Sequence, residues 1–277
     1  MAGSGAGQHP GAGHQTGHEL EAYLAGAPLS AVDGLDEAMR YALEGGKRLR
    51  ARLCLAATRA GGGDPCRALP VAAALELVQA FSLVHDDLPA LDDDDLRRGR
   101  PSTHARFGEG VAILAGDGLL NAAYRLVLER LDAPAEVRAA VAAELARGVA
   151  GMIDGQYLDV TEGAGSHDEL VRLHGLKTGA LITSSVCSGL HVAGAEAAVT
   201  DRYRTFAAEL GLLFQIVDDL LDGDSGESQS SVSVLGADGA RRLAGESHDR
   251  ARELLAAAPG DTAELASLTE LIASRRA

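Results

Sequence analysis

Residues 85–104 read HDDLPALDDDDLRRGRPSTH, in which six carboxylates are followed within a few residues by three guanidinium groups. An apolar helical run ending in Phe81-Ser82-Leu83-Val84 precedes them. Burial of that run draws the acids toward the interior, where a charge needs a partner. Carboxylates suit Mg²⁺, which commonly bridges protein and phosphate oxygens, and arginine is a two-point phosphate partner. A solvated acidic loop is the alternative, and the apolar flank favours an ion site over it.

A second acidic cluster, Asp218-Asp219-Leu220-Leu221-Asp222, follows the apolar stretch 212–217. Asp218 and Asp222 are four residues apart, so they share a helix face on which like charges repel. A shared cation removes that repulsion. We therefore expect two acidic helix ends to face one another.

Asp86 and Asp92 are six residues apart, about 120° out of phase on a regular helix. Pro89 lies between them, and its missing N–H and fixed φ end or distort a helix. We expect the chain beyond Pro89 to turn back, so that Asp92 joins Asp86 at one metal.

The chain from Glu19 onward is rich in Ala, Leu, Glu and Arg, is broken at Gly and Pro, and contains no convincing strand. This pattern predicts one all-α domain over residues 19–277, after a disordered tail over residues 1–18. A polar loop is expected at Gly223–Gly236. The expected helices cover residues 19–25, 32–44, 47–60, 68–87, 105–131, 134–157, 167–174, 177–193, 199–222, 239–257 and 262–275.

Composition excludes several classes of protein. A formal charge of −15 argues against a nucleic-acid partner. We expect no membrane span, because no segment reads as apolar over the length of a bilayer, and no signal peptide at residues 1–17. The three cysteines, Cys54, Cys66 and Cys187, are scattered, so each is interpreted as a small core residue. A cytoplasmic location is the resulting expectation.

Only two of the 25 basic residues are lysine, Lys47 and Lys177. Lysine is a compact point charge on a flexible stem, which some sites require. Lys47 lies in GGKRLR at 45–50 and Lys177 in GLKTG at 175–179, where glycine lets backbone amides approach an anion. Both contexts indicate phosphate contacts.

Together these motifs resemble those of the trans-prenyl diphosphate synthases, specifically the bacterial farnesyl and geranylgeranyl diphosphate synthase group. The resemblance spans nearly the whole chain and implies an antiparallel helix bundle around a deep central cavity, usually as a homodimer. It rests on the ordered motifs Gly45–Arg50, Asp86–Arg98, Gly151-Met152 with Gly155-Gln156, Lys177-Thr178, and Phe214-Gln215 before the second acidic cluster.

Carried onto matching positions, the resemblance implies three Mg²⁺ ions on an allylic diphosphate, with Asp86, Asp87, Asp92, Lys177 and Asp218 as the catalytic group. The implied metal ligands are Asp86, Asp87, Asp92, Asp218, Asp219 and Asp222. The implied donors to the allylic diphosphate are Arg97, Lys177 and Gln215. The implied isopentenyl diphosphate site is Lys47, Arg50 and Arg98, with Arg48 nearby, and the remaining implied substrate contacts are Gly46, Gln79 and Thr178.

The chain departs from the family pattern in two places. Gln79 stands where family members usually carry a histidine, and it donates through an uncharged amide. No basic residue occurs between Arg204 and Arg241, although the family normally has a longer, lysine-bearing loop there. A weakened regulatory subunit of a prenyl synthase is therefore one alternative. A terpene cyclase is another, which the GGKR motif and the second acidic cluster oppose.

Product length depends on Phe81 and Ser82, the fifth and fourth residues before Asp86. By resemblance, an aromatic ring here is a floor that stops elongation near fifteen carbons. Helix phase places Phe81 about 140° from Asp86, which leaves a core role open. The interpretation is a farnesyl diphosphate synthase, with a geranylgeranyl diphosphate synthase as the alternative.

Overall fold

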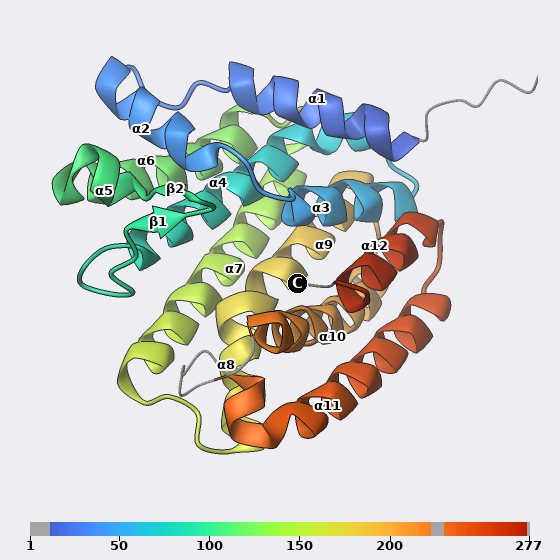
Figure 1. The fold of residues 1–277 in the computed structure, drawn as a ribbon. Helices are drawn as coiled ribbons and strands as arrows, with labels where there is room; N and C mark the ends of the chain where they lie inside the picture. The colour runs from blue at the N-terminus through green and yellow to red at the C-terminus, as the bar shows by residue number, and fades with distance from the viewer. Residues whose placement is uncertain (1–11, 223–229, 276–277) are drawn as a thin grey trace, which may run out of the picture.

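The computed structural model describes residues 12–222 and 230–275, and it shows a bundle of helices with a small hairpin at one side (Figure 1). This confirms the predicted all-α class. The α-helices are α1 (Ala12–Gly26), α2 (Asp33–Leu43), α3 (Leu49–Ala60), α4 (Leu69–Asp86), α5 (Thr103–Phe107), α6 (Glu109–Arg125), α7 (Ala135–Thr161), α8 (His167–His174), α9 (Ala180–Ala193), α10 (Ala197–Asp222), α11 (Ser231–Ala256) and α12 (Ala263–Ala273).

Three short helical turns interrupt or extend this bundle. They are the 3₁₀ turn η1 (Pro65–Ala68) and the π-helical turns η2 (Leu126–Arg130) and η3 (Gly175–Gly179). A π turn widens the helix by one residue per turn and is frequent at functional sites. Turn η3 joins α8 directly to α9 and carries Lys177 and Thr178.

A two-stranded hairpin, β1 (Leu96–Arg97) and β2 (Arg100–Pro101), follows the first acidic cluster. The sequence pattern predicts no strand, and that prediction is wrong here. Arg98 and Gly99 connect the strands with φ of 56° and 73°. Two positive φ values in a two-residue turn match the right-handed twist of a hairpin, and the strands themselves are too short for an alternating pattern to show.

Buried apolar side chains of the described residues form two large clusters. One joins α1, α2, α4, α6 and α7, together with one side of α3. The other joins α3, α9, α10, α11 and α12. Cys54 and Cys187 are buried as expected, whereas Cys66 is exposed because it lies in the surface turn η1.

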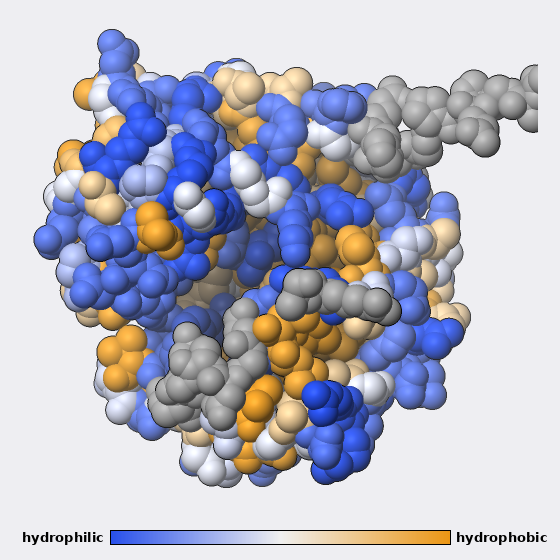
Figure 2. Space-filling model, in the orientation of Figure 1, coloured by the Kyte–Doolittle hydropathy of each residue, from blue (hydrophilic) through white to orange (hydrophobic). Residues whose placement is uncertain are grey.

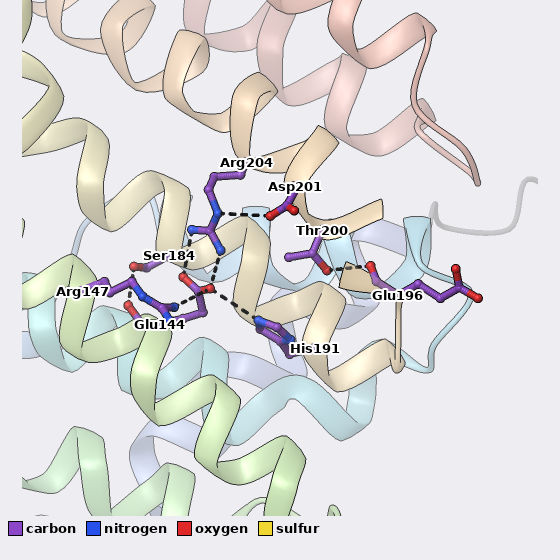
Figure 3. A network of polar contacts seen from close by, with 8 residues as sticks. All are labelled: Glu144, Arg147, Ser184, His191, Glu196, Thr200, Asp201 and Arg204. Atoms are coloured by element: carbon purple, nitrogen blue, oxygen red, sulfur yellow. Dashed lines mark hydrogen bonds and ion pairs between the residues drawn. The ribbon is translucent and has the colours of Figure 1, made fainter. Parts of the chain in front are cut away.

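A buried ion-pair cluster fastens α7, α9 and α10 to one another (Figure 3). Glu144 on α7 accepts from Arg204 on α10, with Arg204 Nη1 at 3.1 Å, and lies 2.8 Å from Arg147 and 3.4 Å from His191 on α9. Burial alone raises the pKa of the Glu144 carboxyl, but the hydrogen bonds from His191 and Arg204 and the charges of Arg204 and Arg147 outweigh it and hold that pKa at about 2.

Several element boundaries differ from the expected ones. Helix α1 begins at Ala12, inside the tail expected to reach residue 18, and the rest of that tail, residues 1–11, lies outside the described residues. Helix α11 begins at Ser231, inside the expected loop, because Ser230 caps it in a reciprocal hydrogen-bond pair with Ser233. Gly236, with φ of 70°, kinks this helix. Residues 223–229 of the expected loop lie outside the described residues.

Two of the described helical stretches are long and apolar enough to span a membrane by length and composition, Pro65–Asp86 and Glu109–Arg130. The expectation that no segment would pass this test is therefore wrong. The most apolar window of the first is 72% buried inside the protein and that of the second 44%. A helix buried in a protein core meets the same criterion as a membrane span, so these helices are weak evidence for one.

Candidate active site

The first acidic cluster folds back on itself at the end of α4. The helix ends at Asp86, and the Asp92 N–H donates to the Asp86 carbonyl at 2.8 Å. The Asp94 N–H donates to the Asp87 carbonyl at 3.1 Å. The chain thus reverses around Pro89, as the sequence predicts, and Asp86 and Asp92 become neighbours.

The positive charge of Lys177 acts on both Asp86 and Asp92. Burial raises the pKa of the Asp86 carboxyl to about 6; the charge of Lys177 lowers it and the charge of Asp92 raises it further. The pKa of the Asp92 carboxyl is also raised, by burial first; the charge of Lys177 lowers it and the charges of Asp94 and Asp159 raise it further. Such a pair of carboxylates favours the binding of a cation, because a cation removes both the burial penalty and the mutual repulsion.

Lys177 is held at this cluster by the close approach of η3 to α7. A Cβ on Gly155 would lie 2.3 Å from the Lys177 backbone nitrogen, so only glycine permits this packing. The Lys177 ammonium donates to Asp159, also on α7. Burial by itself lowers the pKa of Lys177, but Asp159, Asp86 and Asp92 raise it overall, so the side chain is a cation at neutral pH.

Two adjacent arginines of the hairpin, Arg97 and Arg98, point in opposite directions. Arg97 binds Asp87 through Nε at 2.8 Å, and Asp87 is 2% exposed. Arg98 Nη1 donates to the Glu44 carbonyl at 2.8 Å. Its Nη2 lies close to Gly46, where an added Cβ would be 3.0 Å from it. Arg97 is the last residue of β1, whereas Arg98 is the first residue of the turn and has a φ of 56°, so the backbone changes direction between them. Asp87 is thus paired with Arg97, and its charge also raises the pKa of Asp86.

Basic side chains, including that of Arg98, lie around the buried acid Glu76. Glu76 accepts from the Ala51 N–H at 3.0 Å, and Arg48 lies 3.9 Å from it. Burial lowers the pKa of Arg50 while Glu76 and Asp218 raise it, and Arg50 Nε has no hydrogen-bond partner among the described residues. Lys47 is exposed beside this group and Gln79 is half-buried. The structure therefore brings the basic side chains of Arg48, Arg50 and Arg98 together, with Gly46 beside them.

In the second acidic cluster, Asp218 and Asp219 have different surroundings. Asp218 lies 2.8 Å from Arg275, a residue near the end of the chain. Asp219 is 7% exposed and accepts from Gln215 Nε2 at 2.8 Å and from the Ser231 N–H at 2.5 Å. Burial raises the pKa of Asp219, and its hydrogen bonds from His174, Ser231 and Gln215 lower it overall. Asp222 is the last residue of α10, and the role predicted for its side chain lies outside the described residues.

An apolar cavity of about 300 Å³ opens beside Asp86 and Lys177. Its walls come from α4, α7 and η3. The lining residues at its base and sides are Phe81, Ser82, His85, Met152, Ile153 and Tyr157. The Phe81 ring is 8% exposed and meets the His85 ring edge-on at 5.0 Å, so both chain-length candidates line the cavity. Figure 2 shows the molecule hollowed near the middle of the face in view.

The acids fit Mg²⁺ in donor type and in net charge, since Asp86 and Asp92 are neighbouring carboxylates with raised pKa values. Over residues 12–222 and 230–275, no three acidic, histidine or cysteine side chains converge closely enough to hold one ion by themselves. A diphosphate that supplies further oxygens would complete such a site.

A family model described as polyprenyl synthetase matches residues 32–238. The chain belongs to this family. It is 43% identical over 263 residues to a farnesyl diphosphate synthase of Geobacillus stearothermophilus, which covers 87% of this chain and 88% of that protein. It is 42% identical to a geranylgeranyl diphosphate synthase of Cyanophora paradoxa, over 72% of this chain and 68% of the other.

Solved structures of the family share the fold. A ligand-free FPP/GFPP synthase from Zymomonas mobilis superposes with a TM-score of 0.86 at 33% identity, covering 95% of this chain and 97% of the other. A geranyltransferase from Legionella pneumophila gives 0.85 at 32% identity, over 95% and 93%. The chain is therefore a member of a trans-prenyltransferase family in both sequence and fold.

Sequence reasoning missed four residues that the structure places at the site. Asp159 lies three residues after the Gly155-Gln156 motif, one helical turn away, and this spacing was a usable signal. Glu76 and His174 lie in ordinary helical contexts and gave no signal. Arg275 gave no signal either, because nothing in sequence order links it to Asp218.

Proposed function

We propose that the protein condenses an allylic diphosphate with isopentenyl diphosphate, head to tail, and releases farnesyl diphosphate as its main product. The observation that carries this proposal is that Asp86 and Lys177 line an apolar cavity whose lining also includes the aromatic ring of Phe81, while the charge of Asp92 acts on Asp86. Charged groups in the lining suit a diphosphate, and apolar walls suit a prenyl chain.

The two substrates have separate anchors. Lys177, Arg97 and Gln215 support the allylic diphosphate, together with Asp86, Asp92 and Asp218 as ligands of Mg²⁺. Bound there, Mg²⁺ neutralises the charge that builds up on the leaving diphosphate. Lys47, Arg50 and Arg98 bind the isopentenyl diphosphate. The negative charge of Glu76 attracts Arg48 and Arg50.

The reaction breaks the C1–O bond of the allylic substrate, and the electron pair leaves with the diphosphate. The cavity walls hold the allylic cation away from water. The alkene of isopentenyl diphosphate then forms the new carbon–carbon bond to C1, and a proton is lost from the adjacent carbon. By family resemblance the departing diphosphate takes that proton, so no side-chain base is assigned.

A homodimer is proposed as the working form. Support comes from exposed apolar side chains on α6 and α7 near the cavity, which a second copy would bury: Ile113, Leu114, Ile153, Tyr157 and Val160. Covering them would also keep water from the cavity rim. The cytoplasmic location stays a prediction.

Incubation of purified protein with Mg²⁺, isopentenyl diphosphate and each allylic primer in turn tests the function. The expected product is a fifteen-carbon diphosphate. Cyclic hydrocarbons would indicate a terpene cyclase. Substrate binding without any turnover would indicate a regulatory subunit, and a twenty-carbon product the geranylgeranyl alternative.

A further inference from the structure

Protein donors already engage both oxygens of the Asp219 carboxylate. Gln215 Nε2 donates to Oδ1 at 2.8 Å, and the Ser231 N–H donates to Oδ2 at 2.5 Å. His174 Nε2 lies 3.2 Å from the same Oδ2. Asp219 is 7% exposed, His174 4% and Ser231 fully buried. Three of the about four acceptor sites of this carboxylate are therefore taken by protein donors, and a metal ion at Asp219 would compete with buried hydrogen bonds.

These contacts fasten three helices to one another. Asp219 and Gln215 belong to α10, His174 ends α8, and Ser231 begins α11. His174 Nε2 also lies 3.1 Å from the Ser231 hydroxyl. Because Asp219 accepts from every one of them, it is the common acceptor of a buried network.

The same network fixes which way the Gln215 amide points. Thr178 Oγ1 donates to Gln215 Oε1 at 2.7 Å, and Gln215 Nε2 donates to Asp219. A carboxylate only accepts, so a flipped amide would set two oxygens against each other. In the observed orientation Nε2 keeps a second N–H for another acceptor, next to Thr178 and Lys177 on η3.

We propose that Asp219 is a positioning residue that orients Gln215 toward the allylic diphosphate, and not a Mg²⁺ ligand. The inference rests on the proposed function, because it takes Gln215 as a donor to that substrate. Asp218, one residue earlier and about 100° around the helix, keeps the metal role. Arg275 lies 2.8 Å from Asp218, whose side chain is 35% exposed, so an incoming ion reaches it more readily than it reaches Asp219.

The matched variants Asp219→Asn and Asp218→Asn test the assignment. Calorimetry measures binding of a non-ionising allylic thiolodiphosphate over a series of Mg²⁺ concentrations. Asp218→Asn is expected to raise the Mg²⁺ concentration at half-maximal binding about tenfold or more. Asp219→Asn is expected to leave that concentration within about twofold and to weaken analogue binding at saturating Mg²⁺ about tenfold, as the loss of one hydrogen bond to a charged group predicts.

Two further variants test the route through Gln215. Gln215→Leu should weaken analogue binding as much as Asp219→Asn does, and the double variant should be no weaker than either. Thr178→Val keeps every acid and should also weaken analogue binding with an unchanged Mg²⁺ requirement. Metal-free thermal unfolding should show a lower midpoint for Asp219→Asn than for Asp218→Asn, because only the former breaks the buried network.

A raised Mg²⁺ requirement in Asp219→Asn, equal to that of Asp218→Asn, would overturn the inference. So would additive losses in the double variant, or unchanged analogue binding in Thr178→Val. Failure of the wild-type protein to bind the analogue at any Mg²⁺ concentration would overturn the proposed function, and the inference with it.

Discussion

Asp86 lines an apolar cavity, and its environment opposes its ionisation. The pKa of its carboxyl is raised to about 6, so the destabilising effect of the charge begins near pH 4 and is complete above about pH 6. Asp86→Asn should therefore stabilise the metal-free protein at pH 8 by about 2–3 kcal/mol, with no gain below pH 4. Urea unfolding at both pH values measures this, and an equal gain at pH 4 and pH 8 would show that ionisation of Asp86 is not the cause.

Phe81 is the residue that the product assignment depends on most. It lines the cavity and its ring is held edge-on by His85, so removal of the ring deepens the cavity. Phe81→Ala should shift the product from fifteen toward twenty carbons, as measured by mass spectrometry of the dephosphorylated alcohols. Phe107→Ala, which removes an aromatic ring that packs on Tyr41 away from the cavity, is the control. Unchanged product length in Phe81→Ala would place the floor elsewhere.

The sequence predicted the individual site residues better than it predicted their partners. The reversal at Pro89 and the pairing of Asp86 with Asp92 followed from spacing, and the family resemblance placed Lys177 with them. Their neighbours did not, because Asp87 with Arg97 and Asp219 with His174 are contacts made by tertiary packing. A run of aspartates looks uniform in sequence, whereas burial gives each one a different partner.

At the scale of elements, Glu144 joins three helices through one carboxylate (Figure 3). Its pKa of about 2 means that its contribution to stability is complete above about pH 4.5 and is lost as the pH falls toward 2. Glu144→Gln should lower the free energy of unfolding by about 3 kcal/mol at pH 7, with the difference narrowing below pH 4.5. Denaturant titrations across this range measure it; a difference that is constant with pH would contradict the ion-pair explanation.

Helices were predicted correctly where the helical pattern is long. Prediction failed where a few local hydrogen bonds determine the element. Helices α4, α7, α9 and α10 lie close to their expected ranges. The hairpin was missed because two-residue strands carry no pattern, and the start of α11 because serines read as loop residues although Ser230 caps a helix. Both missed elements border the site, where turns and caps are set by a few hydrogen bonds.

For the whole molecule, the proposed dimer would form through the exposed apolar side of α6. Leu114 is 58% exposed on this helix, and Leu271 is 47% exposed on α12. Leu114→Glu should convert a dimer into a monomer because it places a charge in the buried interface. Leu271→Glu, an equal change elsewhere, should leave the dimer intact. Sedimentation velocity distinguishes them, and a Leu114→Glu variant that sediments as wild type would exclude α6 from the interface.

The central claim is that both acidic clusters act on one diphosphate, although they end different helices, α4 and α10. The most direct test is the turnover of Asp86→Ala and Asp218→Ala with isopentenyl diphosphate, an allylic primer and Mg²⁺, with circular dichroism to confirm folding. The account predicts that each folded variant loses several orders of magnitude in turnover. Near-normal turnover in either variant would contradict it.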